Sequence, residues 1–317
     1  MKLLNFLTAI LFAPLILFGQ EKIYFESANP FSFKDIITDL HNQQHHNVYG
    51  ILRMPDNFLK TEKYPLVIAV AGSNGWSDHH YEYLKMYRAN GIATFELCSF
   101  KSRGIESTVG TQTEVTTAMM ILDSYRALDT LAQHPNIKPE RIAITGWSLG
   151  GGVSLFAAWE PLKKTISTKN SFAAHLPIYP PCIVTPTLLE FGDNPIHILI
   201  GELDNWTPAE ACLELVNKAK KHSNIDLTIY PNAHHSFDRD GPLLIKDNGY
   251  LLEDCRFIMQ ENGTVTMNFL NIPMTTPILQ KIGLATCAKR GPTYGGNKKA
   301  KIQALDFAKK FMNKHLN

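Results

Sequence analysis

The chain lacks an excess of charge of either sign. Its 317 residues include 31 Lys and Arg and 29 Asp and Glu, a formal net charge of +2. This balance gives no electrostatic argument for a nucleic-acid partner. None of the five cysteines has the C-x-x-C spacing of a zinc or thioredoxin-like site. No internal repeat or low-complexity segment is visible either, so repeat architectures are excluded.

Long hydrophobic runs are also scarce, and the clearest one lies at the N-terminus. Residues 3–18 form an apolar stretch that is short for a bilayer span, preceded by Lys2 and followed by the small residue Gly19. One positive charge, a short apolar core and a small residue are typical of a secretory signal peptide. We therefore predict a signal peptide at residues 1–19, a secreted or periplasmic protein, and no stable membrane anchor. A membrane anchor and an N-terminal strand or core helix are the alternatives.

What the chain has is a large apolar content, 44%, arranged in short runs between helical patterns. The runs are mostly continuous rather than alternating, as in parallel strands covered on both faces. The sequence predicts one doubly wound, mostly parallel α/β domain over residues 20–317. The expected strands are 47–52, 66–70, 92–97, 142–145, 196–200 and 227–230, and the expected helices are 81–90, 115–133 and 209–221.

One C-terminal segment breaks the alternation. Asn262 and Gly263 separate two strand-like runs, which predicts a hairpin with a type I′ turn. We interpret residues 240–290 as an insertion that decorates the domain. The same Asn also begins an N-glycosylation sequon, with a plain turn residue as the alternative.

The motif Gly146-Trp147-Ser148-Leu149-Gly150 is the strongest chemical signal. It lies between a β-branched strand, residues 141–145, and a helix start, residues 151–158. A strand, a tight G-x-S-x-G turn and a helix are the context of a nucleophile elbow, which predicts Ser148 as a nucleophile. A chance motif in a loop is the alternative.

A serine nucleophile needs a base, and the base needs an orienting acid. In α/β-hydrolases these follow the serine in the order acid, then histidine, each after a later strand. Asp204 follows the predicted strand 196–200, and we prefer it to Glu202, which lies earlier in the turn. His235 follows strand 227–230, and we prefer it to its neighbour His234.

The other candidate site residues are chosen by where they lie relative to the predicted strands and helices. The backbone N–H groups of Ser73 and Leu149 are predicted to form the oxyanion hole, because one follows a strand end and the other follows the nucleophile. Trp147 and Trp206 indicate an aromatic-lined substrate pocket, although tryptophan is as often a core residue. Thr207 and Pro208 are read as the N-cap and first residue of the helix over 209–221.

Taken together, these motifs resemble those of the dienelactone hydrolase family of α/β-hydrolases. The resemblance covers residues 45–315 and rests on the motifs 71–75, 99–104, 146–151, 179–182, 201–208 and 230–238. It implies an α/β-hydrolase fold with Ser148, Asp204 and His235 as nucleophile, acid and base. It also places Arg103 where the family binds a substrate carboxylate, with a structural ion pair as the equal alternative. Dienelactone hydrolases proper have cysteine at the elbow and a glutamate in the first of these motifs, so this chain resembles a serine-type relative.

The sequence thus predicts an exported serine hydrolase that cleaves small carboxylic esters or lactones through an acyl-enzyme. No metal or organic cofactor is implied. A peptidase with the same triad and a non-catalytic binding protein on this fold are the alternatives. The sequence leaves the oligomeric state open.

Export makes cysteine pairing an expectation. We predict the disulfide Cys182–Cys212, between neighbouring carboxyl-edge segments, and the disulfide Cys255–Cys287, which brackets the insertion. Cys98 is then left as a free thiol.

Overall fold

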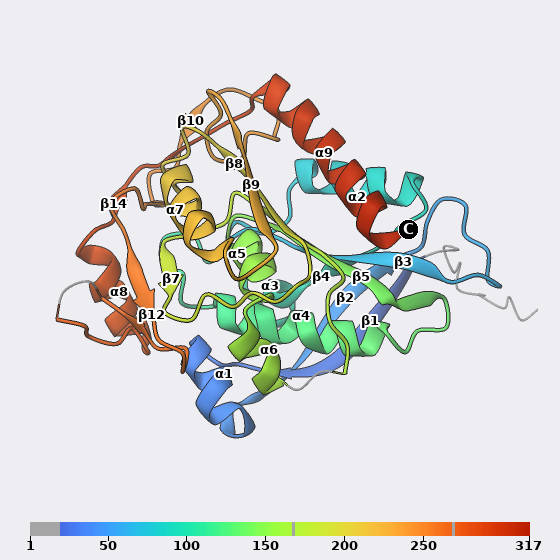
Figure 1. The fold of residues 1–317 in the computed structure, drawn as a ribbon, viewed down its shortest axis with the longest axis horizontal. Helices are drawn as coiled ribbons and strands as arrows, with labels where there is room; N and C mark the ends of the chain where they lie inside the picture. Colours follow the sequence, from blue (N-terminus) through green and yellow to red (C-terminus); the bar gives the residue numbers. More distant parts are fainter. Residues whose placement is uncertain (1–19, 167–168, 268–269) are drawn as a thin grey trace, which may run out of the picture.

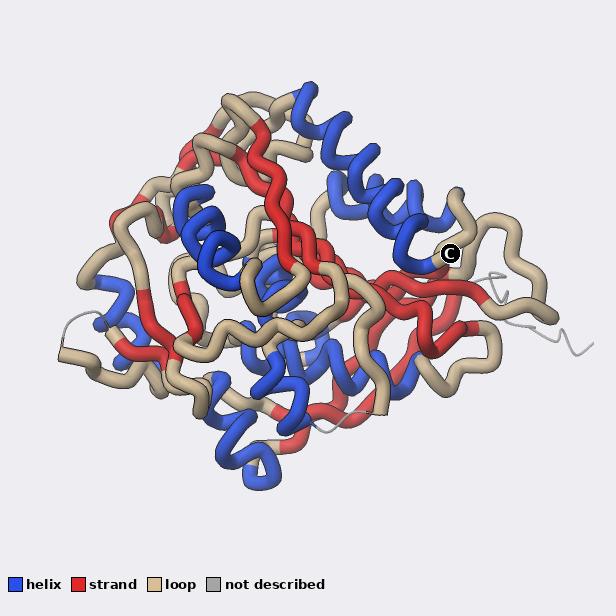
Figure 2. The backbone as a smooth tube through the Cα atoms, viewed as in Figure 1, coloured by secondary structure: helices blue, strands red, loops and turns tan. Residues whose placement is uncertain are grey.

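A large mostly parallel sheet forms the centre of the molecule (Figures 1 and 2). The computed structural model describes residues 20–166, 169–267 and 270–317, so the predicted signal peptide lies outside the described residues. The strand order is β1-β2-β4-β3-β5-β6-β8-β9. β2 pairs antiparallel with β1 and β4, and the pairs from β4 to β9 are parallel. The strands are β1 (Gln20–Ala28), β2 (His45–Arg53), β3 (Tyr64–Val70), β4 (Ala93–Leu97), β5 (Ile137–Trp147), β6 (His175–Ile178), β8 (Ile196–Gly201) and β9 (Ile225–Tyr230).

Helices cover both faces of this sheet. α2 and α9 lie side by side on one face, and α4 and α5 pack together on the other (Figure 1). The doubly wound architecture predicted from the sequence is confirmed. The helices are α1 (Phe33–Asp39), α2 (Asp78–Ala89), α3 (Ser99–Ser102), α4 (Thr117–Leu131), α5 (Leu149–Phe156), α6 (Glu160–Ile166), α7 (Ala209–Ala219), α8 (Pro277–Ala285) and α9 (Lys298–Leu316), with a short 3₁₀ turn at Leu40–Asn42.

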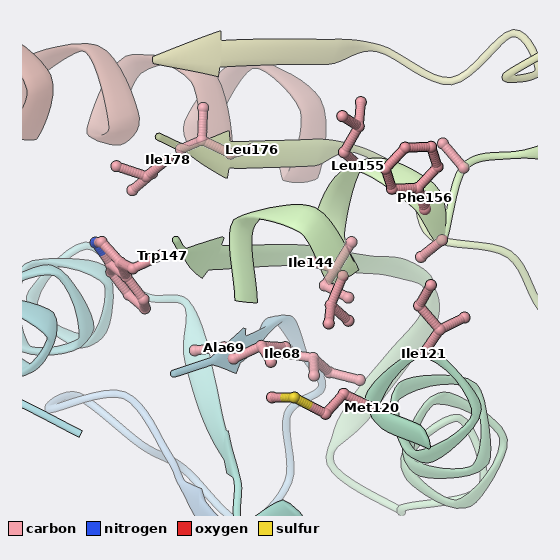
Figure 3. Close-up of a cluster of buried hydrophobic side chains, with 14 of the residues drawn as sticks. Ile68, Ala69, Met120, Ile121, Ile144, Trp147, Leu155, Phe156, Leu176 and Ile178 are labelled. Carbon is pink, nitrogen blue, oxygen red and sulfur yellow. The ribbon is translucent and has the colours of Figure 1, made fainter. Parts of the chain in front are cut away.

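The core explains why the central strands are continuous apolar runs. All seven residues of β3 are buried, because helices cover both faces of the strand. Ile68 and Ile144 project from adjacent strands toward Met120 of α4 and Phe156 of α5 (Figure 3). This packing fixes the carboxyl ends of β5, β8 and β9 at one edge of the sheet, where the loops after them converge.

The six expected strands are present, but two further strands of the central sheet escaped the sequence analysis. β1 is an edge strand with an exposed first half, so it is not an apolar run. β6 has only four residues, and one of them is Pro177. The start of α7 was also predicted wrongly, since its N-cap is Pro208 and the Thr207 hydroxyl contacts Tyr179 O and Asp204 Oδ2 instead.

The C-terminal segment carries the predicted hairpin with a different turn. β12 (Phe257–Met259) pairs with β13 (Val265–Thr266), and β12 also pairs with β7 (Val184–Pro186). Gly263 has φ of +78° whereas Asn262 does not have a positive φ, so the type I′ prediction is wrong. The hydrogen bond from Gln260 N–H to Thr264 O closes a three-residue loop instead, with the left-handed residue last.

The geometry of this loop is set by its contact with α1. A Cβ atom on Gly263 would lie 2.5 Å from the backbone carbon of Phe33, so only glycine allows the approach. The rest of the segment, which extends in the structure to Tyr294, is built from short helices and strands at one end of the molecule (Figure 1). Besides α8 these are β10 (Leu244–Ile245), β11 (Tyr250–Leu251), β14 (Lys289–Arg290) and β15 (Thr293–Tyr294).

Two disulfides are present in the structure. Cys182 is bonded to Cys212, with the Cα atoms 4.9 Å apart, and Cys255 to Cys287, with the Cα atoms 5.1 Å apart. Cys98 is a buried free thiol, and burial raises its pKa, which disfavours the reactive thiolate.

We expect non-reducing peptide mapping of the protein purified from its native host to recover these same two bridges. Cys98 should react with an alkylating reagent only after unfolding, because the folded protein buries it. Recovery of five alkylated cysteines without reductant would contradict both bridges and the oxidising compartment that they suggest.

Candidate active site

Ser148 occupies the sharp turn between β5 and α5. Its φ of 54° lies in the left-handed region, a strained conformation for a residue with a side chain. The turn is tight because Gly150 lies against the neighbouring strand, where a Cβ atom would come 2.1 Å from the carbonyl oxygen of Val70. The local structure therefore has the strand, strained serine and helix of a nucleophile elbow.

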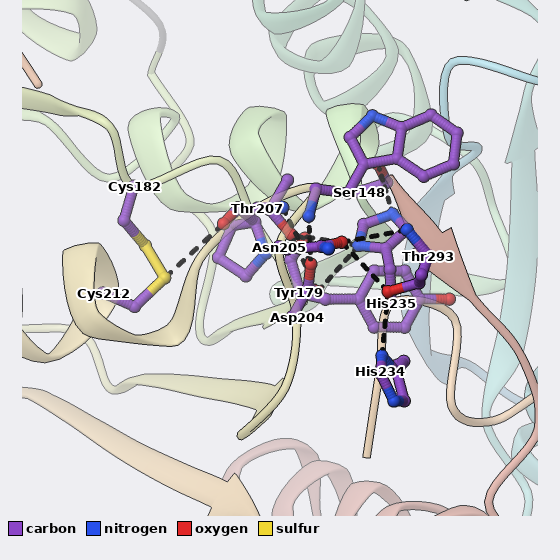
Figure 4. Close-up of polar contacts among 12 residues, drawn as sticks. Ser148, Tyr179, Cys182, Asp204, Asn205, Thr207, Cys212, His234, His235 and Thr293 are labelled. Atoms are coloured by element: carbon purple, nitrogen blue, oxygen red, sulfur yellow. Dashed lines mark hydrogen bonds and ion pairs between the residues drawn. A yellow bond between two sulfur atoms is a disulfide. The ribbon is translucent and has the colours of Figure 1, made fainter. Parts of the chain in front are cut away.

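His235 lies beside this serine. Its Nε2 atom is 3.0 Å from Ser148 Oγ, and its Nδ1 atom is 2.7 Å from Asp204 Oδ2 (Figure 4). The histidine is only 2% exposed and the aspartate 4% exposed. These two contacts form a continuous hydrogen-bonded chain from the Asp204 carboxylate through the imidazole to the Ser148 hydroxyl.

The Asp204 carboxylate is held by several donors. Its Oδ1 atom accepts hydrogen bonds from the backbone N–H groups of Trp206, at 2.9 Å, and Thr207, at 2.8 Å. The Thr207 hydroxyl lies 3.0 Å from Asp204 Oδ2 and 3.1 Å from His235 Nδ1. This network leaves one carboxylate oxygen directed at the imidazole and fixes the side chain.

The two rival residues point elsewhere. Glu202 accepts a hydrogen bond from the backbone N–H of Asn232 at an exposed position. His234 Nδ1 lies 2.9 Å from the hydroxyl of Thr293 (Figure 4). Among the described residues, Asp204 and His235 are thus the acid and histidine that the structure brings to Ser148.

The candidate oxyanion donors lie on two sides of the serine. Leu149 is the first residue of α5, so its N–H is one of the groups at a helix N-terminus without an intrahelical partner. Ser73 follows Gly72, where a Cβ atom would lie 3.4 Å from the Cβ of Ser148. In the described part of the chain, neither N–H donates a hydrogen bond to another group, so both are available to an oxyanion.

The two tryptophans differ in position. The ring of Trp206 lies 4.9 Å from the ring of His235, between two cavities that meet at Ser148. Trp147 is fully buried, its ring stacks on His80 at 4.4 Å, and its Nε1–H donates to Asp238 Oδ2. Trp147 also belongs to the lining of the polar cavity beside Ser148, so its role in substrate binding stays a prediction.

Arg103 forms a buried ion pair and does not face the substrate pocket. Its guanidinium makes two contacts with the Asp123 carboxylate, at 2.7 and 3.1 Å, and Nε donates to Asn29 Oδ1 at 2.8 Å. Further hydrogen bonds go to the backbone carbonyls of Ala28 and Ser99. With its donors used in this way, Arg103 ties β1, α3 and α4 together. Of the two alternatives for Arg103, the structure has the ion pair and not the substrate-carboxylate ligand.

We expect Arg103→Met to lower the free energy of unfolding by about 3–5 kcal/mol, because it leaves the Asp123 carboxylate buried without its cation. Denaturant unfolding measures this loss. Lys101→Met, which removes the same charge from an exposed position of α3, should change it by less than about 0.5 kcal/mol. Selective loss of turnover of anionic esters with unchanged stability would contradict the structural role.

Two cavities of different character open on either side of Ser148. One, of about 200 Å³, is mainly apolar and is lined by residues of α1, α4, α5 and the C-terminal segment. The other, of about 430 Å³, is more polar and is lined by the loop 72–75, the start of α2 and the loop carrying His235. Substrate access to the serine is therefore possible from two chemically distinct sides.

The described residues hold no group of three or more His, Cys, Asp or Glu side chains with the arrangement of a metal site. In the same part of the chain, no helix has the length and apolar character needed to cross a membrane.

Comparison with known proteins decides the family. The sequence model of the dienelactone hydrolase family matches residues 86–253, slightly more than half of the chain. The chain belongs to the dienelactone hydrolase family. As a member of this family it is a carboxylic ester hydrolase with the α/β-hydrolase fold. A search of curated proteins gave no match.

Solved structures similar to this dienelactone hydrolase family member have low sequence identity to it. Esterase 2 from Thermogutta terrifontis, phosphonylated by cyclosarin, is 18% identical with a TM-score of 0.50, covering 64% of this chain and 83% of that chain. Est1E from Butyrivibrio proteoclasticus is 18% identical with a TM-score of 0.45, covering 60% and 86%.

Two parts of this dienelactone hydrolase family site were missed by the sequence analysis. Thr207 follows Asp204 by three residues, a spacing typical of side-chain to backbone turns that could have indicated its contact with the carboxylate. The buried Asp238 accepts hydrogen bonds from Tyr179 and Trp147, and His79 lies 3.8 Å away. No sequence signal points to this second network, because its members come from four separate segments.

Proposed function

We propose that Ser148, His235 and Asp204 act as a catalytic triad that hydrolyses carboxylic esters or lactones through an acyl-enzyme. The observation that carries the proposal is the hydrogen-bonded chain from Asp204 Oδ2 through the imidazole to Ser148 Oγ, with steps of 2.7 and 3.0 Å. Membership of an ester-hydrolase family supports the same reaction.

In the proposed reaction, Ser148 Oγ attacks the ester carbonyl carbon while His235 Nε2 accepts the hydroxyl proton. Asp204 holds the imidazole in the required tautomer and stabilises its charged form. The N–H groups of Ser73 and Leu149 bind the oxyanion. The alcohol leaves with the proton from His235, and water then releases the acid by the same steps in reverse.

We further propose that the protein is exported and that residues 20–317 act as one catalytic domain. The disulfides support this location, because such bonds persist mainly in oxidising compartments. The predicted signal peptide is consistent with it.

A panel of p-nitrophenyl esters of increasing acyl length tests the function, with the corresponding p-nitroanilides of single amino acids and short peptides as the peptidase arm. We expect ester turnover and little amide turnover. Preferred cleavage of the amides would support the peptidase alternative, and binding without turnover of either class would support a non-catalytic protein.

A further inference from the structure

The two cavities beside Ser148 differ in whether His235 forms part of their wall. This histidine lines the polar cavity but is not among the described residues that line the apolar one. In ester hydrolysis the base returns its proton to the oxygen of the leaving alcohol. The alcohol must therefore lie on the side of the serine that His235 faces, and the acyl group is directed to the opposite side.

Building on the triad proposed above, we infer that the substrates are esters of an apolar carboxylic acid with a hydroxylated alcohol. The acyl group occupies the apolar cavity and the alcohol occupies the polar cavity. As the Ser148 Oγ–acyl bond forms, the ester C–O bond breaks, and the serine proton passes through His235 Nε2 to the alcohol oxygen. Water later supplies the oxygen and proton that release the acid and restore the serine.

The acyl cavity is bounded by aromatic and aliphatic side chains from distant parts of the chain. The Phe33 and Phe156 rings, 5.5 Å apart, form part of its wall. Phe257, Val265 and Met274 of the C-terminal segment also line it. Since one water molecule takes up about 30 Å³ in the liquid, a volume of about 200 Å³ has room for roughly six groups of that size. An acyl chain of medium length or a single ring fits this space.

The C-terminal segment is fixed over this cavity by two contacts described above. The disulfide Cys255–Cys287 links the start of the hairpin to the end of α8. The Gly263 turn lies against the backbone of Phe33, which also lines the cavity. The cavity is therefore a preformed space rather than a gap between loosely placed loops.

The alcohol cavity is polar without an excess of either charge. Glu82 and Asp240 both accept hydrogen bonds from Lys301 Nζ, at 2.7 and 3.0 Å, so two carboxylates share one ammonium group. Burial lowers the pKa of His79, although nearby Asp238 opposes this, so the neutral imidazole is favoured. Many donors and acceptors with no net charge suit hydroxyl groups better than an ionic group. The remaining charged residues of the lining are Asp78, Arg239 and Lys246, so the three acidic side chains are balanced by two basic ones of the lining and by Lys301.

Isomeric esters test which cavity takes the acyl group and which takes the alcohol. Ethyl hexanoate and hexyl acetate contain the same atoms with the long chain on opposite sides of the carboxyl group. Because each buried methylene is worth about fourfold, we expect kcat/KM to be at least about tenfold higher for ethyl hexanoate. Equal values, or a preference for hexyl acetate, would overturn the assignment of the two cavities.

A second pair tests the alcohol. Propyl hexanoate and 1-monohexanoylglycerol share the acyl group and a three-carbon alcohol, and differ in two hydroxyl groups. We expect the glycerol ester to be preferred by at least about fivefold, as two additional hydrogen bonds allow. Equal turnover of the two, or a preference for the propyl ester, would overturn the alcohol assignment.

Variants of the C-terminal segment test the acyl cavity. Val265→Trp should lower kcat/KM for p-nitrophenyl hexanoate by at least about tenfold relative to the acetate, because the larger side chain fills the cavity. Met274→Ala should instead move the preferred acyl length upward. Ile258→Ala, in the same hairpin but exposed, is the matched control and should preserve the wild-type preference.

The acetate serves as an internal reference in these experiments. Equal loss on acetate and hexanoate in Val265→Trp, together with an unchanged chain-length preference in Met274→Ala, would overturn the acyl assignment. If the wild-type protein hydrolyses esters through Ser148 but shows no dependence on acyl or alcohol chemistry, only this inference fails. Absence of any Ser148-dependent hydrolysis would instead contradict the proposed function.

Discussion

Ser148→Ala is expected to lower kcat for p-nitrophenyl ester hydrolysis by at least roughly 10⁴-fold, because the variant has no oxygen nucleophile at the elbow. The residual rate should show no burst of p-nitrophenol, since no acyl-enzyme can accumulate. Stopped-flow and steady-state assays of the purified variant measure both effects.

The fold of this variant should be unchanged. Ser148 contributes its backbone N–H to Ile178 O, and alanine keeps that hydrogen bond. The circular dichroism spectrum is therefore expected to match that of the wild type. The melting temperature should differ only slightly, through the strained φ of residue 148. Full esterase activity in a folded Ser148→Ala protein would show that another residue is the nucleophile.

His235→Ala is expected to lower kcat by at least about 10³-fold, because Ser148 loses the group 3.0 Å away that accepts its proton. His234→Ala is the matched control, one residue earlier in the same loop. Its imidazole contacts Thr293 rather than the serine, so a change of less than about tenfold is expected. Steady-state kinetics on one ester substrate compare the two variants, and the reverse order of effects would contradict the assignment of the base.

The parts of the site that could be predicted are those that depend on local sequence. Ser148 lies between a β-branched strand and a glycine-rich helix, and both neighbours are adjacent in the chain. Asp204 and His235 could be placed because parallel strands end at a common edge, so the loops after them converge. The order alone does not choose between His234 and His235. That choice depended on Phe237, which was expected to anchor the loop in the core and is fully buried in the structure.

What could not be predicted depends on contacts between distant segments. Thr207 was read as a helix cap, but the Asp204 carboxylate and His235 lie close enough to engage its hydroxyl. The ion pair of Arg103 with Asp123 requires α3 and α4 to be placed together, which no local pattern specifies. The acyl cavity likewise exists only once the C-terminal segment has packed against α1 and α5.

Covalent labelling of the nucleophile tests the central claim most directly. The wild-type protein is treated with a fluorophosphonate, digested and mapped by tandem mass spectrometry, with the His235→Ala variant as a control for activation. We predict one adduct, on Ser148, formed in step with loss of esterase activity and much more slowly in the variant. Complete loss of activity with the adduct on another residue, or retained activity with Ser148 fully labelled, would contradict the account.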